Sequence, residues 1–445
     1  MKLGLVYGHV SRNMGDLAIN QGSARLIGEL FPDADVRVVL FNPKASCVDD
    51  ARDSFEDLAR VSFGVIHTQP RDRPELFADY HDPRPLRRYL ARPGRFLADL
   101  GLSDCDALLL ASGDHLFSYS AHRRDPNDID LVWRLLPALA AKSAGMRFVA
   151  LPVTVGPNEV PVVTEMLRAF MSLCDALAVR DTESVGFAAT LLAGCAVPAL
   201  LDPAFFAEVP PPARAKEDNL ALVMHLEDAG ARPRTEQSRT AVHRYREHGY
   251  GGSHPFRLAC AVAAAHVAAS AGNIKLLLQS ASADRGLASA IEEELRKLMD
   301  TERVRVVEPT SLSAYEQELS QTRYIVSSRL HTCVMALAQG KEVVGLHYDS
   351  HGHKMLGVFD MLEVAPRCLA VSGSEPGMMA RSALSLLTQH QGCLAGLEER
   401  LQSLRTKMRE WLYSALTSPI RVKPDARALA QLAKPFIRCM KSVGV

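Results

Sequence analysis

Residues 324–348 read YIVSSRLHTCVMALAQGKEVVGLHY, and this stretch decides the fold class. An apolar run at residues 324–326 is followed by two serines and then by a helical pattern that Gly340 ends. A second apolar run at residues 343–346 closes the unit. A strand, a helix and a strand in this order predict a parallel βαβ unit of an open α/β sheet.

The turn between the first strand and the helix carries Arg329 and His331. In open α/β sheets, ligands bind at the carboxyl ends of the strands. The start of a helix adds unpaired N–H groups and the positive end of the helix dipole, which suit an anion. A guanidinium fork suits a carboxylate or a phosphate. The stretch therefore predicts an acidic small-molecule ligand with a histidine beside it.

Composition excludes several classes of protein. The chain has 445 residues, which suits two or three domains. Its 51 basic residues balance 51 acidic ones, so no global field attracts nucleic acid, and no apolar run reaches the length of a membrane span. Nine scattered cysteines without a C-x-x-C pair, and an N-terminus unlike a signal peptide, favour the cytoplasm.

Strand and helix patterns alternate in two blocks. Residues 1–209 form the first, residues 219–370 the second, and residues 371–445 a helical segment with apolar spacing over 397–416 and 426–440. The prolines at 210–212 mark a linker between the blocks. We expect an α/β fold with two Rossmann-like domains, and the tail to pack on them, with an oligomer contact as its alternative use. Further strands are expected at residues 3–7, 36–41, 108–111, 148–153, 176–179, 197–201, 220–224, 274–279 and 304–307.

Small and polar residues follow most of these strands. Each turn alone is weak, because capping and ordinary βα turns use the same residue types. Together they place polar groups on the side of the sheets where ligands bind. The turns contain Asn13, Gly15 and Asp16; Ser112, Gly113, Asp114 and His115; Gly156 and Pro157; Arg180, Asp181 and Ser184; and Asp202.

His347, His351 and His353 form a titratable cluster with Asp349 and Lys354. Histidines are common metal ligands. Two nearby glycines and the lysine favour a cationic rim over an anion instead, so no metal is expected.

An ordered set of motifs resembles the polysaccharide pyruvyl transferases. The resemblance runs over about residues 1–365, and Ser328-Arg329-Leu330-His331 is its most specific part. The other motifs are Asn13-x-Gly15-Asp16, Gly156-Pro157, Arg180-Asp181-x-x-Ser184, Asp202-x-Ala204-Phe205, and Tyr348 followed by Lys354.

This resemblance implies a two-lobed, GT-B-like fold and a cytoplasmic enzyme of polysaccharide or exopolysaccharide biosynthesis. Such an enzyme moves the pyruvyl group of phosphoenolpyruvate onto two hydroxyls of a sugar, lipid-linked sugar or polysaccharide, giving a ketal and phosphate. It needs no cofactor beyond this donor. The second domain is the expected phosphoenolpyruvate side and the first the acceptor side.

The resemblance also assigns roles. Arg329 and His331 are associated with phosphoenolpyruvate, and the imidazole of His331 suits proton transfer near neutral pH. Asp16, Asp114 and His115 are candidate bases for the acceptor hydroxyl. The residues expected to bind substrate are Asn13, Gly15, Ser112, Gly113, Asp114, Gly156, Pro157, Arg180, Ser328, Leu330, Tyr348 and Lys354.

Two other functions stay open at this point. A glycosyltransferase that uses a nucleotide sugar shares the expected fold. A non-catalytic binding relative is the other alternative, because relatives usually carry a glycine triplet where this chain has Ser112-Gly113-Asp114.

Overall fold

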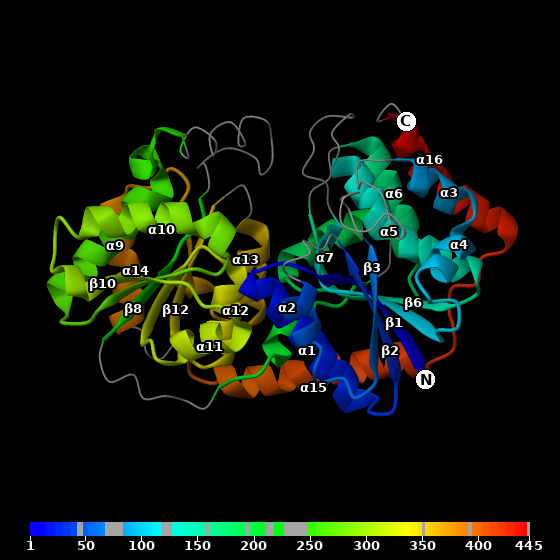
Figure 1. Ribbon diagram of the computed structural model, residues 1–445, viewed down its shortest axis with the longest axis horizontal. Helices are drawn as coiled ribbons and strands as arrows, with labels where there is room; N and C mark the ends of the chain where they lie inside the picture. Colours follow the sequence, from blue (N-terminus) through cyan, green and yellow to red (C-terminus); the bar gives the residue numbers. More distant parts are fainter. Residues whose placement is uncertain are drawn as a thin grey trace. The chain divides into compact units, whose positions relative to one another are not determined.

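The computed structural model describes most of the chain (Figure 1). The described residues are 1–41, 48–66, 83–116, 127–156, 160–192, 196–210, 218–226, 245, 247–348, 352–389 and 394–442. They form two compact units. The first comprises residues 1–11, 19–206 and 404–445, and the second comprises residues 12–18 and 207–403.

These units differ from the expected domain ranges in two places. A short N-terminal segment, residues 12–18, belongs to the second unit, and the expected C-terminal segment 371–445 is divided between the two. Most of the expected linker, residues 211–217, lies outside the described residues. Two helices, α1 (Met14–Leu30) and α15 (Leu397–Thr417), have residues in both units.

The first unit is built on a parallel sheet with the strand order β3-β2-β1-β4-β6-β5, and β7 pairs with β6. Its buried strands are apolar runs, as expected for a sheet covered on both faces. The strands are β1 (Lys2–His9), β2 (Asp35–Phe41), β3 (Val61–Ile66), β4 (Ala107–Leu110), β5 (Gly113–Leu116), β6 (Arg147–Val155) and β7 (Ala176–Val179). The helices around it include α2 (Val48–Asp53), α3 (Pro83–Ala91), α4 (Pro93–Asp99), α5 (Asn127–Ser143), α6 (Pro161–Leu173), α7 (Thr182–Leu191) and the 3₁₀ turn Pro203–Phe206.

The second unit has a parallel sheet with the order β10-β9-β8-β11-β12-β13. The chain runs outward from β8 to β10, then returns to the other side of β8 and runs outward from β11 to β13. The strand order therefore reverses between β8 and β11, which is where ligands bind in such sheets. The strands are β8 (Leu220–Val223), β9 (Ile274–Leu277), β10 (Val304–Val307), β11 (Tyr324–Ser327), β12 (Glu342–His347) and β13 (Cys368–Ala370). Its α-helices include α9 (His254–Ala269), α10 (Ala281–Leu295), α11 (Leu312–Ser320), α12 (Leu330–Ala338), α13 (Gly352–Met361) and α14 (Pro376–Gln389), with 3₁₀ turns at Tyr250–Gly252, Thr301–Arg303 and Ala365–Arg367.

The strand–helix–strand unit expected over residues 324–348 is confirmed as β11, α12 and β12. The strand expected at residues 197–201 is wrong, because only a single bridge joins Ala199 to Val179 there. Three strands were missed: β3, β13, and β5, which occupies residues read from the sequence as a turn.

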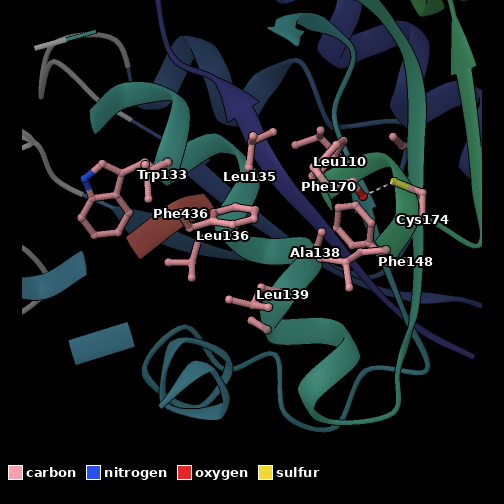
Figure 2. Packing of buried hydrophobic residues seen from close by; sticks show 14 of the residues in the cluster. Leu110, Trp133, Leu135, Leu136, Ala138, Leu139, Phe148, Phe170, Cys174 and Phe436 are labelled. Carbon is pink, nitrogen blue, oxygen red and sulfur yellow. Dashed lines mark hydrogen bonds between the residues drawn. The ribbon is translucent and has the colours of Figure 1, made fainter. Parts of the chain in front are cut away.

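The last helix, α16 (Ala426–Ser442), packs against the first unit. Its buried side chains, Phe436, Cys439 and Met440, join the core formed by α5 and α6. Figure 2 shows Phe436 beside Leu136 of α5. The apolar spacing of the tail is therefore explained by packing inside the chain.

Candidate functional site

Two clusters of polar side chains lie at the carboxyl ends of the strands, one in each unit. The second unit carries the more complete one. Its centre is the turn between β11 and α12, where Arg329 is the N-cap residue of α12. The hydroxyl of Ser327 accepts the amide of Arg329 at 2.9 Å and donates to its carbonyl at 3.0 Å. Ser328 crosses to the end of β8, because its hydroxyl accepts the amide of His225 at 2.8 Å.

Arg329 is held by a buried carboxylate. Its Nη2 donates to Oδ1 of Asp284, in the first turn of α10, and the amide of Ser280 donates to the other oxygen of Asp284 at 3.0 Å. The Arg329 side chain is 15% exposed. Its buried Nε has no hydrogen-bond partner in the described part of the chain. Asp284 thus orients the guanidinium, and the remaining donors suit an oxyanion.

His331 lies in the first turn of α12, against the backbone of Gly15. A β-carbon at Gly15 would lie 2.5 Å from Nδ1 of His331, so only glycine fits there. Gly15 lies in the segment 12–18 and therefore belongs to the same unit as His331. The turn that contains Gly15 and the turn that contains Arg329 and His331 are therefore in direct contact, although the sequence indicated each of them independently as a candidate ligand site.

Gln279 links these two turns. Its Nε2 donates to Oδ1 of Asn13 at 2.8 Å, and its Oε1 accepts the amide and the hydroxyl of Thr332, both at 2.9 Å. Its carbonyl accepts the amide of Met14 at 2.9 Å, and Oδ1 of Asn13 also accepts the amide of Gly15 at 3.1 Å. The segment 12–18 is thereby fixed to the start of α12.

Sequence reasoning missed Gln279 and Asp284. Gln279 was read as the end of a strand, and Asp284 was placed in no expected element. The usable signal was the position of Gln279 two residues after the end of β9, next to the point where the strand order reverses.

The remaining expected residues of this unit lie at different depths. Lys354 is half-buried in the first turn of α13, which follows β12. Leu330 is buried as the first residue of α12. Tyr348 is 2% exposed in the hydrophobic core, where its hydroxyl contacts Nδ1 of His254 at 3.4 Å. Asp16 is half-buried in the first turn of α1, while Asp349 and His351 lie outside the described residues.

The cluster of the first unit is organised around Arg180. Its guanidinium is 1% exposed and donates to Asp114, to Asp202 at 2.7 Å and to Thr154 at 2.8 Å. The two carboxylates balance its charge, since a buried cation needs paired partners. Asp114 keeps 27% of its side chain exposed. Arg180 itself is buried, so its effect on a bound molecule is indirect: it holds Asp114, whose carboxylate is partly exposed.

The turn before Asp114 is tight. Gly113 has a φ of +149°, and a β-carbon there would lie 2.9 Å from Nε2 of His115. The carbonyl of Ser112 lies 2.7 Å from Nε2 of His9, and the His9 ring stacks on that of His115 at 5.9 Å. Burial, together with the charge of Arg134, holds the pKa of His115 well below its usual value of 6.5. His115 is therefore neutral near pH 7.

The motif around Asp181 is a helix cap. Its Oδ1 accepts the amide of Ser184 at 2.8 Å and its Oδ2 accepts the Ser184 hydroxyl at 2.7 Å, as the sequence predicted for the start of α7. Burial raises the pKa of Asp181 to about 6. Gly156 directly follows β6, and Pro157 lies outside the described residues.

In the described part of the chain, the helices include no segment with the length and apolar character of a membrane span.

A family model described as polysaccharide pyruvyl transferase matches residues 13–350, about three quarters of the chain. No curated protein matches the chain. Solved structures do match. A UDP-N-acetylglucosamine 2-epimerase is 13% identical, with a TM-score of 0.56, over 96% of this chain and 98% of that one.

Two further structures are similar to the same degree. The HepE protein of Anabaena, solved with UDP and glucose, is 10% identical over 94% of this chain and 100% of its own, with a TM-score of 0.53. The UDP-GlcNAc 2-epimerase of Neisseria meningitidis, bound to UDP-GlcNAc, is 12% identical over 99% and 100%, with a TM-score of 0.50. Such neighbours have the GT-B fold, so the expected fold class is confirmed.

Proposed function

The chain belongs to the polysaccharide pyruvyl transferase family, and we propose that it transfers the pyruvyl group of phosphoenolpyruvate to two hydroxyls of a sugar, lipid-linked sugar or polysaccharide. The observation that carries this proposal is the contact between Gly15 and His331, fixed by Gln279. This contact places the motif Asn13-x-Gly15-Asp16 beside the motif Ser328-Arg329-Leu330-His331, although the two lie near opposite ends of the matched region. Together they form a turn that suits an anion.

The donor carries a carboxylate and a phosphate, so it needs more than one cationic or N–H contact. Arg329, oriented by Asp284, supplies one. Lys354 and the positive end of the α12 dipole supply further attraction for the anion. Ser328 and Leu330 give the turn its shape, and Asn13 and Gly15 close it.

The reaction requires an acid and a base. Protonation of the methylene carbon of phosphoenolpyruvate creates an oxocarbenium-like centre at the neighbouring carbon, which the first hydroxyl attacks. Phosphate then leaves, and the second hydroxyl closes the ketal. The two hydroxyl groups lose one proton each. One of these protons replaces the proton that the acid gave to the methylene carbon, and the other leaves with phosphate. We assign the acid to His331.

The acceptor is assigned to the carboxyl end of the first sheet. Asp114 offers a partly exposed carboxylate there, next to Ser112 and Gly113. Asp114 is then the favoured base for the acceptor hydroxyl, with Asp16 and His115 as the alternatives. Arg180 holds Asp114 in place.

The first test pairs two variants. Arg329→Ala would leave Asp284 buried without its partner, which costs about 3–5 kcal/mol of stability. The double variant Arg329→Gln with Asp284→Asn replaces the ion pair by a neutral one of similar shape. We expect it to fold and to bind phosphoenolpyruvate roughly 10- to 150-fold more weakly in isothermal titration, from the loss of about 1.5–3 kcal/mol.

The same titration separates the alternatives. Binding of a UDP-sugar without binding of phosphoenolpyruvate would favour a glycosyltransferase. Phosphate release from phosphoenolpyruvate in the presence of sugar acceptors separates an enzyme from a binding relative. Unchanged donor affinity in the folded double variant would contradict the site.

A further inference from the structure

Charge is unevenly distributed in this neutral chain. Two helices of the first unit, α3 and α16, pack against each other (Figure 1). Neither contains an acidic residue. Between them they carry seven basic ones, which we call the basic face: Arg84, Arg87, Arg88, Arg427, Lys434, Arg438 and Lys441.

Four of these seven cations have no ion pair among the residues that the structure describes. All seven side chains are exposed. Arg88 has an ion pair with Asp99 at 3.7 Å and Arg438 one with Glu165 at 2.7 Å. In the described part of the chain, no carboxylate pairs with Arg87, Arg427, Lys434 or Lys441. Exposed cations without partners attract an external anionic surface.

The orientation of α16 is fixed. Phe436, Cys439 and Met440 are buried in the core of the first unit, so the opposite side of the helix must face outward. That side carries Lys434, Arg438 and Lys441. Among them lies Ile437, a large apolar side chain that is 39% exposed. An apolar residue among cations is typical of helices that lie in a membrane interface.

We propose that the basic face docks the protein on an anionic phospholipid surface, with Ile437 inserted at the level of the headgroups. The seven cations complement the negative charge of the lipids. Nucleic acid is the weaker match, because the aromatic residues of these helices, Tyr89 and Phe436, are buried and offer no surface for base stacking. This inference is independent of the transfer reaction.

Vesicle co-sedimentation of the full chain tests the proposal. We expect binding to vesicles of phosphatidylcholine with 30 mol% phosphatidylglycerol, little binding to phosphatidylcholine alone, and loss of binding in 0.5 M salt. Each basic residue near an anionic membrane strengthens binding roughly fivefold. The triple variant Arg87→Gln, Lys434→Gln and Lys441→Gln should therefore bind about 100-fold more weakly.

A matched control neutralises three exposed cations elsewhere. The variant Arg257→Gln, Arg381→Gln and Lys407→Gln has the same net charge and should bind the vesicles nearly as well as the wild type. Ile437→Gln should weaken vesicle binding but not binding to a duplex oligonucleotide. Equal losses in the two triple variants, no sedimentation of the wild type, or tighter binding to the oligonucleotide than to the vesicles would each overturn the proposal.

Discussion

The contact between Gly15 and His331 is so close that a single added β-carbon at residue 15 would disturb the proposed donor site. In Gly15→Ala the new atom must displace the ring or the first turn of α1. A displacement approaching 1 Å of a catalytic group costs about 100-fold in rate. We expect turnover, measured by phosphate release, to fall roughly 10- to 100-fold.

Gly186→Ala is the matched control for this substitution. Gly186 lies in α7, and a β-carbon there has no neighbour within 4 Å. It should keep full turnover and gain about 1 kcal/mol of stability from helix propensity. Normal turnover in Gly15→Ala would remove His331 from the proposed chemistry.

His115 predicts a dependence of stability on pH. Its pKa is lowered in the folded protein, so the unfolded chain binds more protons once the pH falls below 6.5. The stability that the neutral, buried His115 contributes is fully present above pH 6.5 and is lost as the pH falls below that value. At pH 5.5 the loss is about 1 kcal/mol.

Urea unfolding at pH 7.5 and 5.5 measures this loss. His115→Gln keeps a neutral polar side chain that cannot titrate, so the difference in unfolding free energy between the two pH values should shrink by about 1 kcal/mol relative to the wild type. An equal difference in both proteins would show that folding does not lower the pKa of His115.

At the scale of elements, Asp175 joins three parts of the first unit. Its Oδ2 accepts the ammonium of Lys142 and the amide of Phe148, and its Oδ1 accepts the amides of Arg421 and Val422, each at 2.9 Å. These bonds tie α5, β6 and the segment before α16 together. Asp175→Ala leaves Lys142 buried without a partner and should cost about 3–5 kcal/mol in chemical unfolding.

Limited proteolysis should then cut near residues 419–425, which lose their anchor. The variant Asp175→Asn with Lys142→Met removes both charges but keeps an amide oxygen for the two backbone N–H groups. It should recover most of the stability and resist cleavage. If it is cleaved as readily as Asp175→Ala, the anchor is the charge pair and not the hydrogen bonds to residues 421 and 422.

The elements predicted from the sequence were those with a clear period. The strand–helix–strand unit around Arg329 and His331 and both tail helices were predicted near their observed bounds. Strand β5 was missed because Gly113 and Asp114 are poor strand formers, and its pairing with β6 is a tertiary effect. The position of Gln279 near the reversal of the strand order marked it as a candidate, but its role could not be predicted, because its hydrogen-bond partners Asn13 and Thr332 are distant in the sequence.

At the scale of the whole molecule, local patterns predicted two Rossmann-like sheets, but they could not predict which unit each segment joins. Residues 12–18 follow the first strand of the first unit, yet they pack in the second. This follows from hydrogen bonds of Asn13 and Met14 to Gln279, which no local pattern records.

The fact that residues 12–18 belong to the second unit also has a consequence for folding during biosynthesis. These residues leave the ribosome before His331, which follows roughly 300 residues later. At about 5–20 residues per second, the first turn of α1 waits roughly 15–60 s for its partner. The hydrogen bonds of Asn13 and Met14 to Gln279, and the contact of Gly15 with His331, can form only after those later residues have emerged.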